Sequence, residues 1–569
     1  MRSSRAALPI FAGILLAARC HCSQSKCSQS TFKAVLDSIP GTSINYIAEV
    51  PLNGSFGDAA TNIPFPHNAT GLPELCAASF NTKTPGDTSY NFGVFLPSQW
   101  NGRFLATGNG GLGGGINWID MGIFSQYGFA SMSTDTGHSS AATDGKWGLH
   151  QPEKLINWGY RAMHGSATAT KEIVRSYYAE DIEFSYYASC STGGRQGLRE
   201  IQLHPDTFDG VVVGAPAWWT THLQTWTVKQ GLTNLPANSS HHVPSALFGA
   251  IADEMVRQCD AQDGVPDGII SDPDGCNFDF NRLLCSPGHK TACLTPSQID
   301  TAERLYRNYL DTDQALVFPG MSLGASAAAL SAQPSTLGVD FLRYWVFNDS
   351  SWDYTTFKYE DVLMAEKVNP GGATADDFDL SPFQSRGGKL IHYHGLADDL
   401  IPAGSSRHFY DQVYRTLAPK GIKVDEFYRF FFVPGMQHCM GSTVAPWYIG
   451  GGSQSVTGAS HSVPGFMDPQ HDVILAIMAW VESGKAPDKM IATKFRNDSA
   501  LAGVESQRPL CTYPKQPRYL GHGGVNEASS WECIEINTTR MDQNSSANII
   551  TKLTGESELN SSFTTNIVS

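Results

Sequence analysis

Two residues that could perform nucleophilic catalysis each stand beside a cysteine. Cys190 directly precedes Ser191, and Cys439 directly follows His438. A disulfide between these cysteines would hold the serine and the histidine side by side, although the two segments lie far apart in the sequence. A serine hydroxyl becomes an effective nucleophile only when a neighbouring base takes its proton, and histidine is the usual base. The pattern therefore predicts a serine hydrolase.

The residues around Ser191 suit a tight turn between a strand and a helix. A strand is predicted over 184–189, and small residues including Gly193 precede a helical segment. Such a turn, the nucleophile elbow, projects the serine hydroxyl at the top of a sheet. Of the usual Gly-x-Ser-x-Gly pattern only the second glycine is present, because Ser189 replaces the first. The backbone N–H of Thr192 is then a predicted oxyanion donor, although a serine ahead of two glycines is on its own more often a simple turn.

An acid and a base follow in the chain order that α/β-hydrolases use. Asp398 comes directly after a predicted strand, where it could orient and stabilise a histidine, and its neighbour Asp399 is the alternative acid. His438 lies on a loop after a further predicted strand. The simpler interpretation is a helix-capping aspartate and an ordinary loop histidine. The order, together with the flanking cysteines, favours a Ser191–Asp398–His438 triad.

A glycine-rich segment over 107–115 has two interpretations. In a hydrolase it would supply the second oxyanion donor, from the backbone N–H of Gly110 or Gly111. It also satisfies G-x-G-x-x-G, with Asp135 at about the distance expected of a dinucleotide site. A dinucleotide-dependent oxidoreductase is therefore the rival function, but it leaves the Ser–Asp–His pattern unexplained. An inactive carbohydrate-binding relative is a second rival, against which the intact triad argues.

A second candidate site is an acidic loop that contains Asp260, Asp263 and Asp267. Three carboxylates so close together would repel one another unless a cation lies among them. Oxygen ligands in a turning loop suit calcium, with the carbonyls of Val265 and Ile269 completing the shell. The spacing is not that of an EF-hand, and the simpler interpretation is a solvated acidic turn. We expect a structural calcium ion here.

The start of the chain has the pattern of a secretory signal peptide. Arg2 and Arg5 supply positive charge, an apolar stretch over 8–18 follows, and small residues surround the expected cleavage between Ala18 and Cys22. The apolar stretch is shorter than the roughly 20 residues that a membrane-spanning helix needs. We therefore expect a secreted, extracellular protein. The net charge of −15 argues against nucleic acid or an anionic membrane as a partner.

An even number of cysteines in an exported chain indicates disulfides. Ten of the twelve cysteines remain after the expected cleavage, and no pair has the CxxC spacing that metal binding would favour. The spacings suggest, without proving, four local bridges and a long one: Cys27–Cys76, Cys259–Cys276, Cys285–Cys293, Cys511–Cys533 and Cys190–Cys439. N-glycosylation is expected at surface sequons that begin at Asn53, Asn68, Asn238, Asn348, Asn497, Asn537, Asn544 and Asn560.

Apolar runs typical of strands alternate with segments of helical periodicity. We expect strands over 90–96, 103–106, 129–133, 184–189, 210–214, 389–394 and 427–433, and helices over 158–178, 194–204, 405–417 and 471–483. This alternation predicts the α/β class, with a mostly parallel sheet that is covered on both faces.

The stretch over 216–385 interrupts the alternation with tryptophans, four cysteines and the acidic loop. Because the sheet pattern resumes at Lys389, ahead of the predicted acid and base, we interpret this stretch as a lid inserted between two strands. The predicted organisation is a signal peptide, a core in two parts that flank the lid, and a flexible Ser/Thr/Asn-rich tail: 1–22, 23–215, 216–385, 386–535 and 536–569.

On these motifs the chain resembles the tannase and feruloyl esterase family, which consists of secreted, mostly fungal esterases. The resemblance extends over residues 27–533 and rests on four segments: 190–197, 259–269, 395–398 and 438–439. It implies an α/β-hydrolase core with an inserted lid, the Ser–Asp–His triad, the Cys190–Cys439 disulfide, and a lid calcium ion held by the five residues of the acidic loop named above.

The family divides by substrate. Feruloyl esterases release ferulic and related hydroxycinnamic acids from plant cell-wall polysaccharides, whereas tannases cleave galloyl esters. The form Ser-Thr-Gly-Gly-Arg-Gln-Gly over 191–197 is more similar to the feruloyl esterases. The resemblance therefore implies a serine carboxylesterase for phenolic esters, with a feruloyl ester as the expected substrate and a galloyl ester as the alternative.

Overall fold

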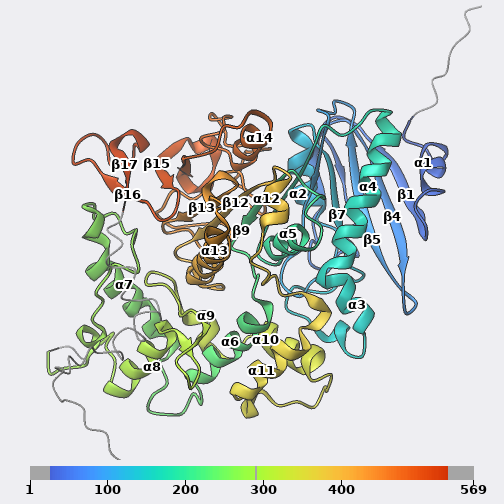
Figure 1. Cartoon of the computed structure of the whole chain (residues 1–569). Helices are drawn as coiled ribbons and strands as arrows, with labels where there is room; N and C mark the ends of the chain where they lie inside the picture. Colours follow the sequence, from blue (N-terminus) through green and yellow to red (C-terminus); the bar gives the residue numbers. More distant parts are fainter. Residues whose placement is uncertain (1–25, 289–290, 536–569) are drawn as a thin grey trace, which may run out of the picture.

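A computed structural model describes residues 26–288 and 291–535. Within them, nine strands form one twisted sheet in the order β1-β4-β5-β7-β6-β8-β9-β12-β13 (Figure 1). Strands β6 to β9, β12 and β13 run parallel, and β1, β4 and β5 complete one edge in antiparallel pairing. Their bounds are β1 Thr42–Val50, β4 Leu75–Thr84, β5 Thr88–Pro97, β6 Arg103–Ala106, β7 Ala130–Thr134, β8 Phe184–Cys190, β9 Gly210–Gly214, β12 Lys389–Gly395 and β13 Tyr428–Val433.

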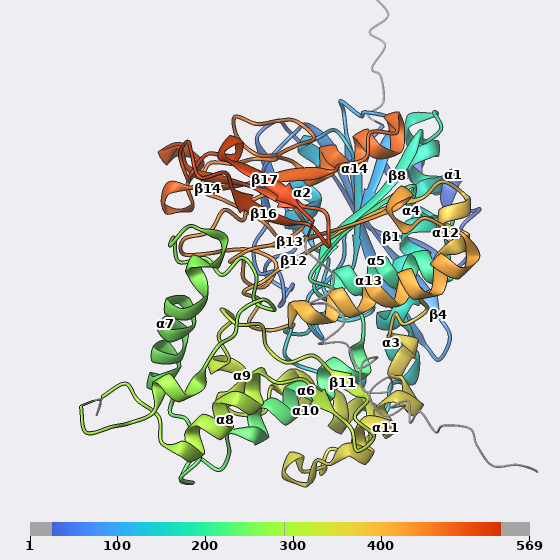
Figure 2. The same cartoon turned by 60° about the vertical axis from the view of Figure 1, so that its left-hand side comes forward.

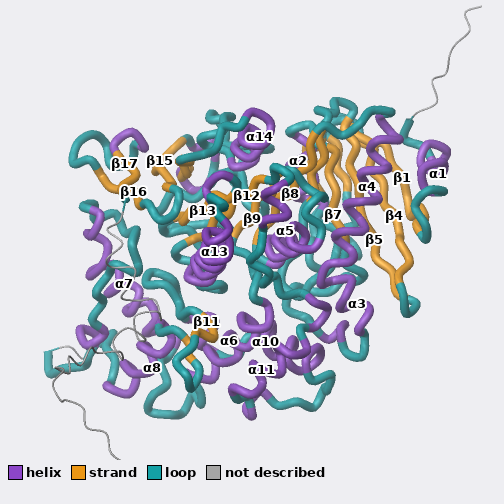
Figure 3. Tube along the Cα trace, in the orientation of Figure 1, coloured by secondary structure: helices purple, strands orange, loops and turns teal. Residues whose placement is uncertain are grey.

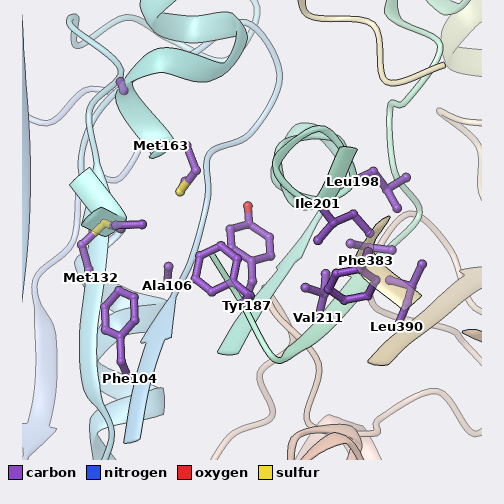
Figure 4. Close-up of a cluster of buried hydrophobic side chains, with 14 of the residues drawn as sticks. Phe104, Ala106, Met132, Met163, Tyr187, Leu198, Ile201, Val211, Phe383 and Leu390 are labelled. Atoms are coloured by element: carbon purple, nitrogen blue, oxygen red, sulfur yellow. The ribbon is translucent and has the colours of Figure 1, made fainter. Parts of the chain in front are cut away.

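Helices cover both faces of this sheet. One face packs against five helices: α1 Gln29–Leu36, α4 Ala162–Tyr178, α5 Thr192–Leu203, α12 Ser381–Ser385 and α13 Ala403–Leu417. Figure 4 shows part of that core, where Tyr187 and Val211 of the strands lie on the side of Ile201 of α5, and Phe104 lies beside Met132. The opposite face packs against α2 Trp118–Gln126 and α14 Val473–Ser483. Because alternate residues of each strand point to opposite faces, both sets are apolar.

A mostly helical insertion separates β9 from β12, and Figures 2 and 3 show it as a layer outside the sheet. It has apolar clusters of its own, one around Trp226 and Phe318 and one around Phe341 and Trp345. The chain rejoins the main core at Ala375, ahead of α12. The elements of the insertion are α6 Thr220–Thr233, α7 Phe248–Cys259, α8 Pro296–Tyr306, β10 Tyr309–Leu310, β11 Leu316–Phe318, α9 Ala328–Ala332, α10 Thr336–Asp340 and α11 Tyr359–Val368.

Several smaller elements lie beside the sheet. A short helix, α3 Pro152–Ile156, precedes α4, and three two-stranded sheets flank the core. Their strands are β2 Gly54–Phe56 with β3 Ala69–Leu72, β14 Lys489–Phe495 with β15 Val504–Cys511, and β16 Gln516–Tyr519 with β17 Trp531–Ile534. The observed architecture confirms the predicted α/β class with a mostly parallel sheet.

The five disulfides in the described part of the chain have the pairings that the spacings suggested. The five sequon asparagines in this part are exposed: Asn53, Asn68, Asn238, Asn348 and Asn497. No helix among residues 26–288 and 291–535 is long and apolar enough to cross a membrane. The predicted signal peptide, the predicted tail and the sequons at Asn537, Asn544 and Asn560 lie outside the described residues.

Candidate active site

Ser191 lies in the turn between β8 and α5, at the carboxyl end of the sheet. Its backbone has φ 61° and ψ −126°, which a side chain-bearing residue adopts only when its surroundings impose it. The surroundings are backbone hydrogen bonds: Ser191 N–H donates to Gly214 O (2.9 Å), and Ser191 O accepts from Ala217 N–H (3.1 Å). The turn therefore presents the hydroxyl in a fixed direction, as an elbow requires.

Ser189, which replaces the first glycine of the motif, fits this turn. Its Oγ accepts a hydrogen bond from the backbone N–H of Gly108 at 3.3 Å, which ties the elbow to the glycine-rich segment. The side chain has room because position 193 is glycine: a Cβ there would lie 1.9 Å from Ser189 Oγ. The serine for glycine exchange is thus compatible with the elbow geometry.

The structure brings the predicted nucleophile, base and acid into one hydrogen-bonded line. His438 Nε2 lies 3.0 Å from Ser191 Oγ, and His438 Nδ1 lies 2.7 Å from Asp398 Oδ2. The other carboxylate oxygen of Asp398 accepts the backbone N–H groups of Leu400 and Ile401 at 2.9 and 2.8 Å. The partner of His438 is therefore Asp398 and not the neighbouring aspartate.

The electrostatics of this line suit a histidine that acts as a base. Burial opposes ionisation of Asp398, but attraction to His438 and hydrogen bonds from His438 and His394 outweigh it, so the pKa of Asp398 is lowered. Burial likewise opposes charge on His438, but Asp398 and the nearby Asp399 outweigh it, so the pKa of His438 is raised. Asp398 is consequently an anion that can stabilise an imidazolium beside Ser191.

The Cys190–Cys439 disulfide joins the two halves of this arrangement. It links the residue before the nucleophile to the residue after the base, with a Cα–Cα distance of 6.0 Å. Cys190 is the last residue of β8, and Cys439 has a left-handed backbone with φ 65°. The covalent bridge therefore limits how far His438 can move from Ser191.

Backbone N–H groups for an oxyanion are present on both sides of Ser191. Thr192 is the first residue of α5, where N–H groups lack intrahelical partners. Within the described residues, neither Thr192 N–H nor Gly110 N–H has a hydrogen-bond acceptor. A Cβ on Gly110 would meet nothing within 4 Å, so Gly110 borders open space, whereas Gly111 is packed against Ala142 O. Gly111 N–H likewise has no acceptor within the described residues, so both predicted glycines stay candidate donors.

Two side chains of α5 hold the glycine-rich segment in place. Gln196 forms a reciprocal pair with Asn109: its Oε1 accepts Asn109 N–H at 3.0 Å, and its Nε2 donates to Asn109 Oδ1 at 3.1 Å. Thr192 Oγ1 donates to Gly111 O at 2.8 Å. These bonds fix the segment against the helix that begins at the nucleophile, so both oxyanion donors belong to one rigid unit.

Asp135 does not serve as the acid of a dinucleotide site. Its buried carboxylate accepts hydrogen bonds from Asn91 N–H (2.7 Å), Asn91 Nδ2 (2.6 Å) and Gly137 N–H (2.7 Å). Because these neighbours occupy both oxygens, Asp135 is committed to structure and is not available to a ribose hydroxyl.

The predicted calcium ligands face the backbone of their own loop. The Asp260 carboxylate accepts three N–H groups of residues 267–269, at 3.0 to 3.2 Å. Asp263 accepts Val265 N–H at 3.0 Å and the Ser271 hydroxyl at 2.6 Å. Both carboxylates thus accept hydrogen bonds from groups of the same loop.

The third carboxylate, Asp267, forms an ion pair with Arg508 of β15. Among the residues that the structure describes, no three His, Cys, Asp or Glu side chains are gathered closely enough to hold a metal ion. The predicted shell also includes the carbonyls of Val265 and Ile269, and carboxylates with carbonyls have the chemistry that calcium prefers. Calcium binding stays a prediction.

Three residues of the site were not predicted from the sequence: Asn109, Gln196 and His394. Asn109 and Gln196 fall within the segments 107–115 and 190–197, but a lone amide carries no pattern that indicates its role. His394 does leave a signal, because it precedes the predicted acid by four residues on a buried strand.

A comparison with protein families identifies a match to most of the chain. The model described as "Tannase and feruloyl esterase" matches residues 76–534. The chain belongs to this family. The resemblance noted on the four sequence segments is thereby confirmed.

Individual proteins are also similar to this chain. The chain is 38% identical over 467 residues to "Probable feruloyl esterase B-1" of Neosartorya fischeri, a match that covers 81% of this chain and 86% of that protein. It is similar to the crystal structure of feruloyl esterase B from Aspergillus oryzae, with a TM-score of 0.82, 34% identity, and 90% and 99% of the two chains covered. Tannin acyl hydrolase from Aspergillus niger shares the fold, with a TM-score of 0.72, 22% identity, and 92% and 98% covered.

Proposed function

We propose that this protein is a secreted serine carboxylesterase that hydrolyses phenolic esters and releases ferulic and related hydroxycinnamic acids from plant cell-wall polysaccharide. The observation that carries the proposal is the line from Ser191 Oγ through His438 to Asp398, at 3.0 and 2.7 Å. The names of the relatives that share more than a third of their residues with this chain support the feruloyl substrate.

In the first half of the reaction, Ser191 attacks the ester carbonyl. His438 Nε2 takes the hydroxyl proton, and Asp398 stabilises the resulting imidazolium. The carbonyl oxygen becomes an oxyanion that accepts the N–H groups of Thr192 and of Gly110 or Gly111. When the C–O bond to the alcohol breaks, His438 returns the proton to the leaving oxygen, and the acyl group stays on Ser191.

In the second half, water replaces the alcohol. His438 takes a proton from the water as the water oxygen attacks the acyl carbonyl, and the same N–H groups hold the second oxyanion. Collapse of this intermediate breaks the bond to Ser191 Oγ, which regains its proton from His438. The products are a free phenolic acid and the original enzyme.

The proposal also includes export from the cell, glycan attachment to asparagines and a bound calcium ion. Five disulfides in the described residues support folding in an oxidising compartment. The five exposed sequon asparagines support glycan attachment there. A calcium ion would add cross-links between the oxygen donors of residues 260–269 and would stabilise the insertion without taking part in the reaction.

The deciding experiment compares hydrolysis of methyl ferulate and methyl gallate by the purified enzyme. We expect preference for ferulate, and preference for gallate would identify a tannase instead. Ser191→Ala should lower kcat on the order of 10⁶-fold, as loss of a triad serine does elsewhere. Ser385→Ala, an exposed serine on α12, is the matched control and should retain full activity. Full activity in Ser191→Ala would refute the triad assignment.

A further inference from the structure

A chain of buried hydrogen bonds continues from Asp398 away from Ser191. Asp398 Oδ2 lies 3.1 Å from His394 Nε2, and His394 Nδ1 lies 2.6 Å from Ser406 Oγ. The same Ser406 Oγ lies 2.7 Å from His392 Nε2, and His392 Nδ1 lies 2.7 Å from the Tyr428 hydroxyl. All five side chains belong to residues with 0% exposure. The triad is therefore one end of a longer polar line through the core.

Three elements of the sheet region supply this line. His392 and His394 point to the same face of β12 because they are two residues apart, Ser406 comes from α13, and Tyr428 comes from the adjacent strand β13. Each element is fixed by the surrounding core. Four of the five side chains are thus built into the scaffold, and Asp398 lies in the turn that follows β12.

The acceptors at one end fix the direction of every proton in the line. His394 Nε2 faces two acceptors, Asp398 Oδ2 at 3.1 Å and Ile401 O at 2.9 Å, so it must carry a proton. In a neutral His394, Nδ1 is then an acceptor for the Ser406 hydroxyl. Ser406 Oγ in turn accepts from His392 Nε2–H, and His392 Nδ1 accepts from the Tyr428 hydroxyl. Every donor points towards Asp398.

The opposite direction is less consistent with the surroundings. It would place a second proton, and hence a charge, on His394, and it would turn the Tyr428 hydroxyl away from His392. Among the described residues the hydroxyl of Tyr428 has no other hydrogen-bond partner. Burial also lowers the pKa of His392 well below its usual value, which keeps that ring neutral. The neutral, one-way arrangement satisfies every member of the line.

For Asp398 the consequence is a complete set of donors. Oδ1 accepts Leu400 N–H and Ile401 N–H, and Oδ2 is shared by His438 and His394. A carboxylate has about four acceptor positions, so a fully buried Asp398 is saturated. Without His394, one position would be empty and Oδ2 would interact with His438 alone.

We propose that His394 is a positioning residue of the esterase site. It fixes the orientation of the Asp398 carboxylate and, by sharing Oδ2, limits how strongly Asp398 attracts a proton onto His438. This inference rests on the proposed function of the triad. The charged groups that face His438 are Asp398 and Asp399, and His392 is the titratable neighbour of His394.

The test compares His394→Leu with His394→Gln, using methyl ferulate and the pH dependence of kcat/KM. Leucine removes the donor, so kcat should fall about 10- to 100-fold, the loss that is typical when a partner that orients a metal-ligating side chain is removed, while KM stays unchanged. Because Asp398 Oδ2 is then no longer shared, Asp398 attracts a proton onto His438 more strongly, so the acid limb of the pH profile should also move to higher pH. Glutamine can place an N–H near the position of Nε2 and should restore both the limb and most of kcat.

Two further variants complete the experiment. Ser406→Ala removes the hydroxyl that donates to His394 Nδ1, which makes the Nε2–H of a neutral His394 a weaker donor to Asp398, so a smaller shift of the limb in the same direction is expected. His408→Gln changes a histidine of α13 outside the line and should leave both kcat and the limb as in the wild type. Ser406→Ala and His394→Gln keep the proposal testable if the leucine variant does not fold.

A purely structural role predicts a different result. His394→Leu and His394→Gln would then lose activity equally, with the acid limb of each unshifted, and this outcome would overturn the proposal. Wild-type kcat and an unshifted limb in His394→Leu would do the same. If phenolic esters are hydrolysed and Ser191→Ala is inactive, the proposed function stands whatever the His394 variants show, so the two ideas fail separately.

Discussion

Removal of the Cys190–Cys439 disulfide should separate its two roles, in stability and in positioning. The bridge closes a sequence separation of 249 residues. Restriction of the unfolded chain by a loop of that length corresponds to ~5.5 kcal/mol in the chain-entropy model, an upper value because two further bridges lie inside the loop. The matched control is Cys511–Cys533, with a separation of 22 and a corresponding ~3.4 kcal/mol.

The two double alanine variants should therefore both melt at lower temperature than the wild type, with a difference between them of at most ~2 kcal/mol. Their activities should differ far more. Loss of Cys190–Cys439 frees His438 from its 3.0 Å contact with Ser191, and a displacement of about 1 Å at a reacting group costs about 10²-fold. Loss of Cys511–Cys533 leaves the site untouched and should leave kcat unchanged.

The assay is methyl ferulate hydrolysis well below the melting temperature of either variant, normalised to the folded fraction by circular dichroism. The reasoning is refuted if the Cys190→Ala, Cys439→Ala variant retains wild-type kcat while its melting temperature falls as expected. That result would mean that the loop after β13 positions His438 without covalent help.

Three other perturbations have defined outcomes. Asp399→Asn removes a negative charge that raises the pKa of His438, so the acid limb of kcat/KM should move to lower pH, and an unmoved limb would exclude this influence. A sample with excess calcium should melt at a higher temperature than a sample treated with a chelator. At a calcium concentration of 100 times Kd, the free energy of unfolding should rise by about 2.7 kcal/mol. Identical melting curves would count against the site at residues 260–269. Gln196→Leu breaks both hydrogen bonds to Asn109, so kcat should fall about 10- to 100-fold at constant KM, and an equal rise in KM would point to a substrate contact instead.

The parallel part of the sheet could be predicted because its strands are buried on both faces. The run Gly-Val-Val-Val-Gly of β9 was predicted with the bounds that the structure has, and all five of its residues are buried. Strand β1 was not predicted from the sequence, because it lies at the edge of the sheet and few of its residues are buried. The strands of the pairs β14–β15 and β16–β17 were not predicted either, because each depends on an antiparallel partner in a region that lacks the strand–helix alternation.

A long-range contact accompanies one further difference. The helix predicted over 158–178 begins as a π-helical turn at Asn157–Arg161, and α4 starts at Ala162. The carbonyls of that turn accept the buried guanidinium of Arg195, a residue of α5 whose approach no local pattern reveals.

The candidate site was predictable where chemistry and adjacency coincide. Ser191 and His438 stand beside the cysteines that join them, and Asp398 follows a strand in the expected chain order. His394 falls at the end of the strand predicted over 389–394, where a histidine within an apolar run is usually a core residue. Its role depends on which atoms face it across three elements, and a single sequence does not contain that information.

The insertion leaves the sheet after β9 and returns to it at β12, and these two strands are hydrogen-bonded neighbours, with Val212 opposite Ile391. Entry and exit are consequently adjacent on a rigid support, so a replacement segment of different length would meet the same two anchor points. Residues 216–385 can thus diverge between relatives, or be exchanged as a cassette in a chimera, without any change in sheet register. Such exchange would leave the reacting groups where the host sheet holds them.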